Sequence, residues 1–162
     1  MREKMPRLLV FYDGTCGLCH RWVQWVLQRD RSGIVRFATL QGRCFEKLAR
    51  DYPWLKEMDS LVVVDLTRPD RPPLVRAQAV ARVLEEFPGW RIVARCIRSS
   101  PQWVWNWLYE KTAQRRYSLF SNQGWCRALT PQEKKRFVEE STSGDPCAGL
   151  LSPGGRVRER QT

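Results

Sequence analysis

The chain has 162 residues, which is the length of one domain with a short extension. Apolar residues make up 43% of it, enough to bury a core without disulfide staples, and no apolar run approaches the roughly 20 residues that span a bilayer. The net charge of +11 is spread over nearly every segment, so we favour a solvated basic surface over a dedicated nucleic-acid site. The apolar stretch at 8–12 is too short for a signal peptide, and we expect a cytoplasmic protein.

The first half of the chain alternates between strand and helix patterns. Short apolar runs bounded by turn residues indicate strands, and apolar residues recurring every three or four positions indicate helices. In chain order the patterns predict a strand at 8–12, a helix at 17–29, a strand at 34–39, a helix at 45–52, strands at 61–64 and 74–76, and a helix at 77–87. This order predicts a layered α/β domain.

The second half differs in composition. Residues 89–114 are basic and rich in tryptophan, and Pro101 is expected to open a helix that runs to Lys111. Thr130 to Glu133 has the form of a capping box, which predicts a helix to about Glu140. We therefore expect a domain over 1–140, with a helical extension at 89–140, followed by a disordered tail at 141–162.

Cys16 and Cys19 stand where a strand gives way to a helix. The free N–H groups and dipole of a helix N-terminus favour an anion, which lowers a thiol pKa. Cys16 would then be the attacking thiolate and the more exposed of the two. Cys19, one turn later, would be the resolving thiol that releases the substrate. The pair therefore predicts thiol–disulfide exchange by a protein-disulfide reductase or, more generally, a thiol–disulfide oxidoreductase, with no cofactor. The sequence does not give the redox direction.

The pair has other possible interpretations. A zinc site needs two more ligands. The one histidine, His20, is adjacent to Cys19 and is expected to face solvent, and no second Cys-x-x-Cys exists, so we expect no metal. Two unreactive cysteines on a helix remain an alternative. Asp13 is either an ordinary turn residue or a carboxylate that takes and returns a proton during exchange. In a reducing compartment we expect the remaining cysteines to be thiols rather than bridges, with Cys44 and Cys96 as small buried residues.

The residues around the pair resemble a known family, the DCC family of thiol–disulfide oxidoreductases, which is named for its Asp, Cys and Cys. The resemblance covers roughly residues 8 to 130. It is carried by Phe11-Tyr12-Asp13-Gly14-Thr15-Cys16-Gly17-Leu18-Cys19, by Arg29-Asp30, by Val35 to Gln41, by Asp59-Ser60-Leu61-Val62-Val63 and by Ala113 to Phe120. Ser121 and Ala77 depart from residues that the family usually has.

The resemblance implies a thioredoxin-like three-layer α/β sandwich, here with an added C-terminal helical segment. In such folds a proline before the third strand faces the cysteines, and Ser60 holds that position in this chain. We therefore predict that Asp59 and Ser60 form the opposite wall of the site, with a plain strand entry as the alternative. Cys126 is either a third redox thiol or a small buried residue, and we favour the buried one.

Two further hypotheses concern partners. The expected substrates are disulfide-containing proteins or small thiols, and glutathione is one of them, because its carboxylates could bind at the helix beginning near Ala77-Gln78. The Trp-rich basic stretch from Trp90 to Tyr117 could instead dock on an anionic membrane or on single-stranded nucleic acid. Tryptophans at helical spacing more often belong to a core. Trp103 and Trp107 share one helix face, while Trp105 points elsewhere.

Overall fold

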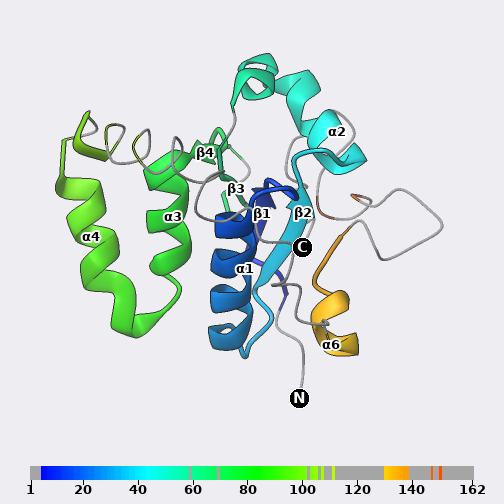
Figure 1. Cartoon of the computed structure of the whole chain (residues 1–162), viewed down its shortest axis with the longest axis horizontal. Coiled ribbons are helices and arrows are strands. Elements are labelled where there is room, and N and C mark those ends of the chain that lie inside the picture. Colours follow the sequence, from blue (N-terminus) through cyan, green and yellow to red (C-terminus); the bar gives the residue numbers. More distant parts are fainter. Residues whose placement is uncertain are drawn as a thin grey trace.

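A computed structural model of the chain shows an α/β fold built on one mixed sheet (Figure 1). It describes residues 5–58, 60–68, 70–101, 103–105, 107, 111, 130–138, 147 and 150. The four strands are β1 (Leu8–Tyr12), β2 (Val35–Thr39), β3 (Val62–Asp65) and β4 (Leu74–Val75), in the order β2-β1-β3-β4. All four strands predicted from the sequence are present, with ends shifted by one residue at most.

The connections explain the strand directions. Helix α1 (Gly17–Arg29) carries the chain from the end of β1 back to the start of β2, so these two strands are parallel and Leu8 pairs with Val35. β3 runs antiparallel to β1 with Phe11 opposite Val62, and β4 returns beside it after a short turn. This strand order and these directions are consistent with a thioredoxin-like fold.

Helices cover both faces of the sheet and complete three layers. Helix α1 and helix α3 (Arg76–Leu84) pack on one face, and helix α2 (Arg43–Asp51) packs on the other (Figure 1). The side chains of β1 alternate between these two layers: Leu8, Val10 and Tyr12 on the first face and Leu9 and Phe11 on the second. Because both faces are covered, every residue of β1 is buried, as its unbroken apolar run predicted.

Beyond α3 the chain adds helices to the side of the sandwich. Helix α4 (Arg91–Ser99) packs against α3 through Ala94 and Ile97. It lies within the helical extension expected from residue 89, but the sequence patterns did not single it out as a separate helix. Its burial pattern explains why: only these two of its nine residues are buried, so its apolar stripe is narrow. Trp103, Val104, Trp105, Trp107 and Lys111 have helical backbone, in agreement with the helix expected after Pro101.

The capping box at Thr130 is present, but the helix it begins is shorter than predicted. Helix α6 spans Pro131–Lys134 instead of continuing to Glu140. Phe137 then forms a parallel bridge with Phe37, and the Phe37 carbonyl accepts a hydrogen bond from the Val138 N–H at 2.9 Å. Phe137 and Val138 are buried on opposite faces of the sheet, and this alternation requires an extended chain. The free edge of β2 therefore ends the helix.

The predicted domain limit at 140 and the disordered tail lie mostly outside the described residues. Two residues of that tail, Cys147 and Leu150, are described, and both pack against the α2 side of the core. In the described part of the chain no helix is long and apolar enough to cross a membrane.

Candidate functional site

The β1–α1 turn places both cysteines at one edge of the sheet. β1 ends at Tyr12, and the Cys16 N–H donates to the Asp13 carbonyl at 3.2 Å to close a turn. Cys16 is the N-cap residue of α1, with extended backbone angles, and the first turn of the helix carries no acidic residue. The unpaired N–H groups of that turn and the helix dipole thus favour negative charge at this end of α1.

The two cysteines differ in exposure, and in the opposite sense to the prediction. Cys16 is only 5% exposed, whereas Cys19 is partly exposed, and both are free thiols. Cys16 is the more buried because its turn folds back on the end of β1, while Cys19 packs at the margin of the core layer between the sheet, α1 and α3. The expectation that Cys16 would be the more exposed sulfur is therefore wrong.

The two sulfurs interact directly. The pKa of the Cys19 thiol is raised well above its usual range, first by its side-chain hydrogen bond with Cys16 and then by burial. The charge of Cys16 and that of the Asp13 carboxylate raise it further, and only a backbone hydrogen bond from Asp13 acts the other way. Cys19 therefore holds its proton and is a poor nucleophile while Cys16 carries charge beside it.

Asp13 lies beside the pair, and three donors meet one oxygen of its carboxylate. Its Oδ1 accepts from the Thr15 N–H at 2.9 Å, the Thr15 hydroxyl at 2.7 Å and the Gln41 amide at 3.0 Å. The carboxylate is 5% exposed, and its charge reaches Cys19. Asp13 is thus a turn-forming residue, as its Asp-Gly context indicated, and it also lies within electrostatic range of a sulfur.

Sequence reasoning missed the part played by Gln41. The parallel strands β1 and β2 end at the same edge of the sheet, so the residues after Thr39 lie beside those after Tyr12. The Gln41 side chain bridges the two loops: its amide N–H donates to Asp13, and its Oε1 accepts from the Gly14 N–H at 3.3 Å. A side-chain carbon at position 14 would lie 3.4 Å from that oxygen, a tight contact. The parallel pairing of the two strands was the signal that could have found Gln41.

His20 and Ser60 complete the surroundings of the turn. His20 does not simply face solvent: its Nδ1 lies 3.1 Å from the Cys16 carbonyl oxygen, so Nδ1 carries the proton and donates it, and its ring meets Tyr12 edge-on. Ser60 is 4% exposed, and its hydroxyl has no hydrogen-bond partner among the described residues. Continuing the β1–β3 register places Ser60 across from Asp13. Asp59, its predicted companion, lies outside the described residues.

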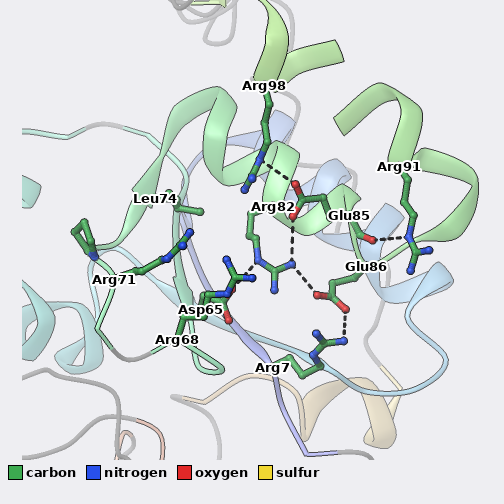
Figure 2. Close-up of a pocket in the computed structure, with 11 residues that line it drawn as sticks. Arg7, Asp65, Arg68, Arg71, Leu74, Arg82, Glu85, Glu86, Arg91 and Arg98 are labelled. Carbon is green, nitrogen blue, oxygen red and sulfur yellow. Dashed lines mark hydrogen bonds and ion pairs between the residues drawn. The ribbon is translucent and has the colours of Figure 1, made fainter. Parts of the chain in front are cut away.

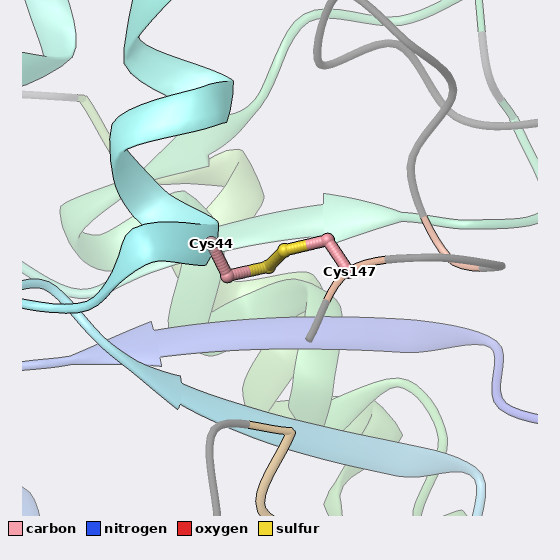
Figure 3. The surroundings of a disulfide bond; sticks show 2 residues. All are labelled: Cys44 and Cys147. Atoms are coloured by element: carbon pink, nitrogen blue, oxygen red, sulfur yellow. A yellow bond between two sulfur atoms is a disulfide. The ribbon is translucent and has the colours of Figure 1, made fainter. Parts of the chain in front are cut away.

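The protein also holds a second cysteine pair, which the sequence analysis did not predict. Cys44, in the first turn of α2, forms a disulfide with Cys147, with the two Cα atoms 5.6 Å apart (Figure 3). Both residues are buried in the α2 layer. Cys44 is thus buried as expected, but the expectation of a free thiol is wrong, because the folded chain brings Cys147 to the same site.

The other cysteines have different surroundings. Cys96 is exposed on α4, contrary to the expectation of a small buried residue, because the helix turns only Ala94 and Ile97 toward α3. Cys126, the candidate third thiol, lies outside the described residues. Within the described ranges no group of three or more His, Cys, Asp or Glu side chains is arranged to hold a metal ion.

The chain is similar to a known protein family over most of its length. Residues 10–122, which include the whole β1–α1 turn, match the DCC1-like thiol-disulfide oxidoreductase family. The chain belongs to this family. The expected resemblance is thereby confirmed, and the family implies thiols or disulfides as substrates.

Two relatives cover most of the DCC1-like chain. The uncharacterized protein YuxK of Bacillus subtilis is 28% identical over 138 residues, which is 84% of this chain and 97% of YuxK. A DCC family protein of Arabidopsis thaliana, named as chloroplastic, is 29% identical over 129 residues, covering 76% of this chain and 71% of the relative. No solved structure matches the chain.

Proposed function

We propose that this chain is a thiol–disulfide oxidoreductase that acts through Cys16 and Cys19, with Cys16 attacking and Cys19 resolving. The observation that supports this most is the hydrogen bond between the two sulfurs at the N-terminus of α1, which keeps the proton on Cys19. Cys19 keeps its proton, whereas Cys16 lies where negative charge is favoured. Cys16 is therefore suited to be the nucleophile and Cys19 the resolving thiol.

Exchange would proceed in two steps. The Cys16 thiolate attacks one sulfur of a substrate disulfide, a mixed disulfide forms, and the other substrate sulfur leaves as a thiolate. Cys19 then loses its proton and attacks the Cys16 sulfur, which forms the Cys16–Cys19 disulfide and releases the second substrate thiol. The substrate has gained two electrons, so in this direction the protein is a protein-disulfide reductase, and an external thiol must reduce it for the next cycle.

Asp13 supports the second step as a proton acceptor. Its carboxylate acts on Cys19 electrostatically and is held in place by Thr15 and Gln41. Burial and the charge of Asp13 still raise the pKa of Cys19 once Cys16 is in the mixed disulfide. The resolving attack therefore needs a base, and a buried carboxylate beside Cys19 is suited to take that proton. Ser60, across the register from Asp13, forms part of the wall that the substrate would meet.

Substrate access requires movement of the turn. Cys16 is almost fully buried, so residues 13–16 must shift before an outside sulfur can reach it. Leu18 lies between the two cysteines in sequence and is 38% exposed, which offers an apolar contact to a bound peptide. A protein substrate that binds at Leu18 would supply binding energy for that opening.

Trapping tests the division of roles. With a disulfide-bonded substrate peptide, the Cys19→Ser variant is expected to accumulate a mixed disulfide through Cys16, whereas the Cys16→Ser variant should form none. Cys96→Ser is the matched control, since Cys96 is a free thiol on a distant helix, and it should behave as the unmodified protein. Mass spectrometry of the trapped species identifies the linked cysteine. A mixed disulfide through Cys19, or none in either variant, would contradict the proposal.

Glutathione is a second substrate class to be tested. α3 begins at Arg76, whose N–H donates to the Leu61 carbonyl at 3.1 Å, so this helix end lies next to Ser60 and near the site. A glutathione-coupled assay would distinguish the routes, because a monothiol route keeps its activity in Cys19→Ser and a dithiol route loses it.

Docking is a second candidate function, and the exposure of the tryptophans supports it. Trp103 is 73% exposed and Trp107 58% exposed, whereas Trp105 is partly buried, as the helix periodicity predicted. Exposed tryptophans on a basic stretch suit the surface of an anionic membrane, and this is the partner we test. Trp103→Ala combined with Trp107→Ala should then reduce sedimentation with anionic vesicles, and indifference to vesicles would exclude it.

For the compartment we keep the cytoplasm as the expectation. Disulfides are rare in a reducing cytosol, so the Cys44–Cys147 pair should be largely reduced there. Alkylation of thiols in intact cells, followed by mass spectrometry, measures this directly.

A further inference from the structure

Figure 2 shows the residues that line a cavity of about 310 Å³, none of which is a cysteine. It is formed by the β3–β4 turn, the C-terminal half of α3 and helix α4. Asp65 on its wall pairs with Leu8, the first residue of β1, whereas Cys16 follows the last residue of that strand. At about 3.4 Å per strand residue, the cavity lies more than about 10 Å from the cysteine pair, at the opposite end of the sheet.

Arginine dominates the lining. The cavity wall holds Arg7, Arg68, Arg71, Arg82, Arg91 and Arg98, against three carboxylates. A net charge of this sign and density is costly to gather around one cavity unless a counter-charge offsets it.

The three carboxylates are already neutralised by arginines of the wall. Arg82 is 8% exposed, and it donates to Asp65 and to Glu86, both at 2.7 Å. Glu86 also accepts from Arg7 at 2.8 Å, and Glu85 pairs with Arg98 at 2.9 Å. These contacts form a network of ion pairs in the cavity wall, in which the charges of three arginines and three carboxylates cancel (Figure 2).

The remaining positive charge therefore belongs to Arg68, Arg71 and Arg91. Arg91 donates to the Glu85 carbonyl oxygen at 3.2 Å, which fixes its position without neutralising it. Arg68 and Arg71 have no carboxylate partner among the described residues. The turn that presents them is ordered by hydrogen bonds from the Arg68 N–H to the Asp65 carbonyl and from the Arg71 N–H to the Arg68 carbonyl, both at 3.1 Å.

We propose that this cavity binds a phosphate-bearing anion through Arg68, Arg71 and Arg91. The guanidinium fork matches two oxygens of a phosphate, and three uncompensated cations suit a compact group with more than one negative charge. The volume is at the lower end of the range for small-ligand sites, which fits one or two phosphate groups rather than an extended chain. The site is independent of the cysteine chemistry.

Calorimetric titration with inorganic pyrophosphate tests the proposal. Arg68→Gln combined with Arg71→Gln should raise the Kd by at least about tenfold, because each change removes charge-assisted hydrogen bonds. Arg31→Gln combined with Arg50→Gln is the matched control, since it removes the same net charge from exposed sites elsewhere. It should leave the Kd within about twofold at a fixed ionic strength.

Three results would overturn the proposal: no binding of pyrophosphate by the unmodified protein, equal weakening by the control variant, or tighter binding of citrate than of pyrophosphate. Both variants should remain folded, since all four arginines are exposed, and a thermal melt of each variant checks this.

The phosphate could come from a soluble compound or from a lipid headgroup, and a second arm separates them. Sedimentation with phosphatidylglycerol vesicles, compared with phosphatidylcholine vesicles, is measured for the same variants. If Arg68→Gln with Arg71→Gln loses both pyrophosphate and vesicle binding, the source is a lipid. If it loses pyrophosphate alone, the source is soluble.

Discussion

The two cysteine pairs of this protein start from similar positions and differ in their partners. Cys16 and Cys44 both lie at the N-terminal end of a helix, after parallel strands that end at the same edge of the sheet. Cys16 meets Cys19 one helical turn later as a free thiol, on the α1 side of the sheet. Cys44 meets Cys147 across 103 positions of sequence, in a disulfide on the α2 side.

This difference shows what sequence spacing determines. A partner three residues away on a helix is fixed by local backbone geometry, so the pair stays together whether or not it is bonded, and it can pass electrons outward. A partner far along the chain is brought close only by the folded core, so the bond constrains the unfolded chain and acts on stability. We expect Cys16 and Cys19 to be the catalytic pair, and Cys44 and Cys147 to be a structural pair wherever they are oxidised.

The largest expected effect is on exchange. Cys16→Ala should reduce the rate of disulfide reduction by at least about two orders of magnitude, because it removes the nucleophile. Cys44→Ser should leave the rate within about twofold under native conditions, since it removes no group of the β1–α1 turn. Reduction of a fluorescent disulfide peptide measures both. If Cys44→Ser is as inactive as Cys16→Ala while still folded, the distinction between a catalytic and a structural pair is contradicted.

The next effect is on stability, and here loss of Cys44 should matter although it should not affect the exchange rate. Cys44→Ser should lower the free energy of unfolding by about 4–5 kcal/mol, the chain-entropy value for a closed loop of about 100 residues. Cys96→Ser, on an exposed helix face, should change it by less than about 0.5 kcal/mol. Urea unfolding of the oxidised proteins gives both numbers. Equal stability of Cys44→Ser and the unmodified protein would show that the bond does not act as a clamp.

The third effect is a shift in titration. Cys16→Ala removes the first cause of the raised Cys19 pKa, so that pKa should fall and more thiolate should be present at a given pH. The rate of Cys19 alkylation at pH 8 should rise by about tenfold for each unit by which the pKa falls. Alkylation rates between pH 7 and pH 10, read by mass spectrometry, test this. A rate no faster than in the unmodified protein would mean that the sulfurs do not interact.

The smallest effect concerns Ser60. Its buried hydroxyl lacks a partner among the described residues, so Ser60→Ala should not lower stability and could raise it by up to about 1 kcal/mol. If the hydroxyl faces the cysteines during exchange, the same change should slow the reaction by several-fold. Stability and rate measured on one sample separate the two roles: an unchanged rate makes Ser60 a plain strand-entry residue.

Much of the fold could be predicted from sequence, because β1 and β3 carry unbroken apolar runs and α1 and α3 have clear periodicity. The parts that could not be predicted depend on contacts between distant segments. In the sequence, Phe137 and Val138 look like the end of a helix, and it is their pairing with the edge of β2 that makes them extended. Nothing in the sequence near Cys147 indicates that it forms a disulfide with Cys44.

The site divides in the same way. The pairing of Cys16 with Cys19 and the turn at Asp13 follow from local sequence. The burial of Cys16 and the bridge made by Gln41 depend on how two loops pack at the sheet edge. Local patterns therefore predict which cysteines lie together, and tertiary packing decides how accessible they are.

A redox titration with mapping of each cysteine tests the central claim most directly. The protein is equilibrated across a series of dithiol–disulfide buffers, its remaining thiols are alkylated, and the bonded pairs are identified by mass spectrometry. The account predicts that Cys16 and Cys19 interconvert reversibly between two thiols and one disulfide, as a two-electron couple separate from Cys44–Cys147. If Cys16 and Cys19 stay as thiols at every potential while only Cys44–Cys147 titrates, the assignment of the catalytic pair is contradicted.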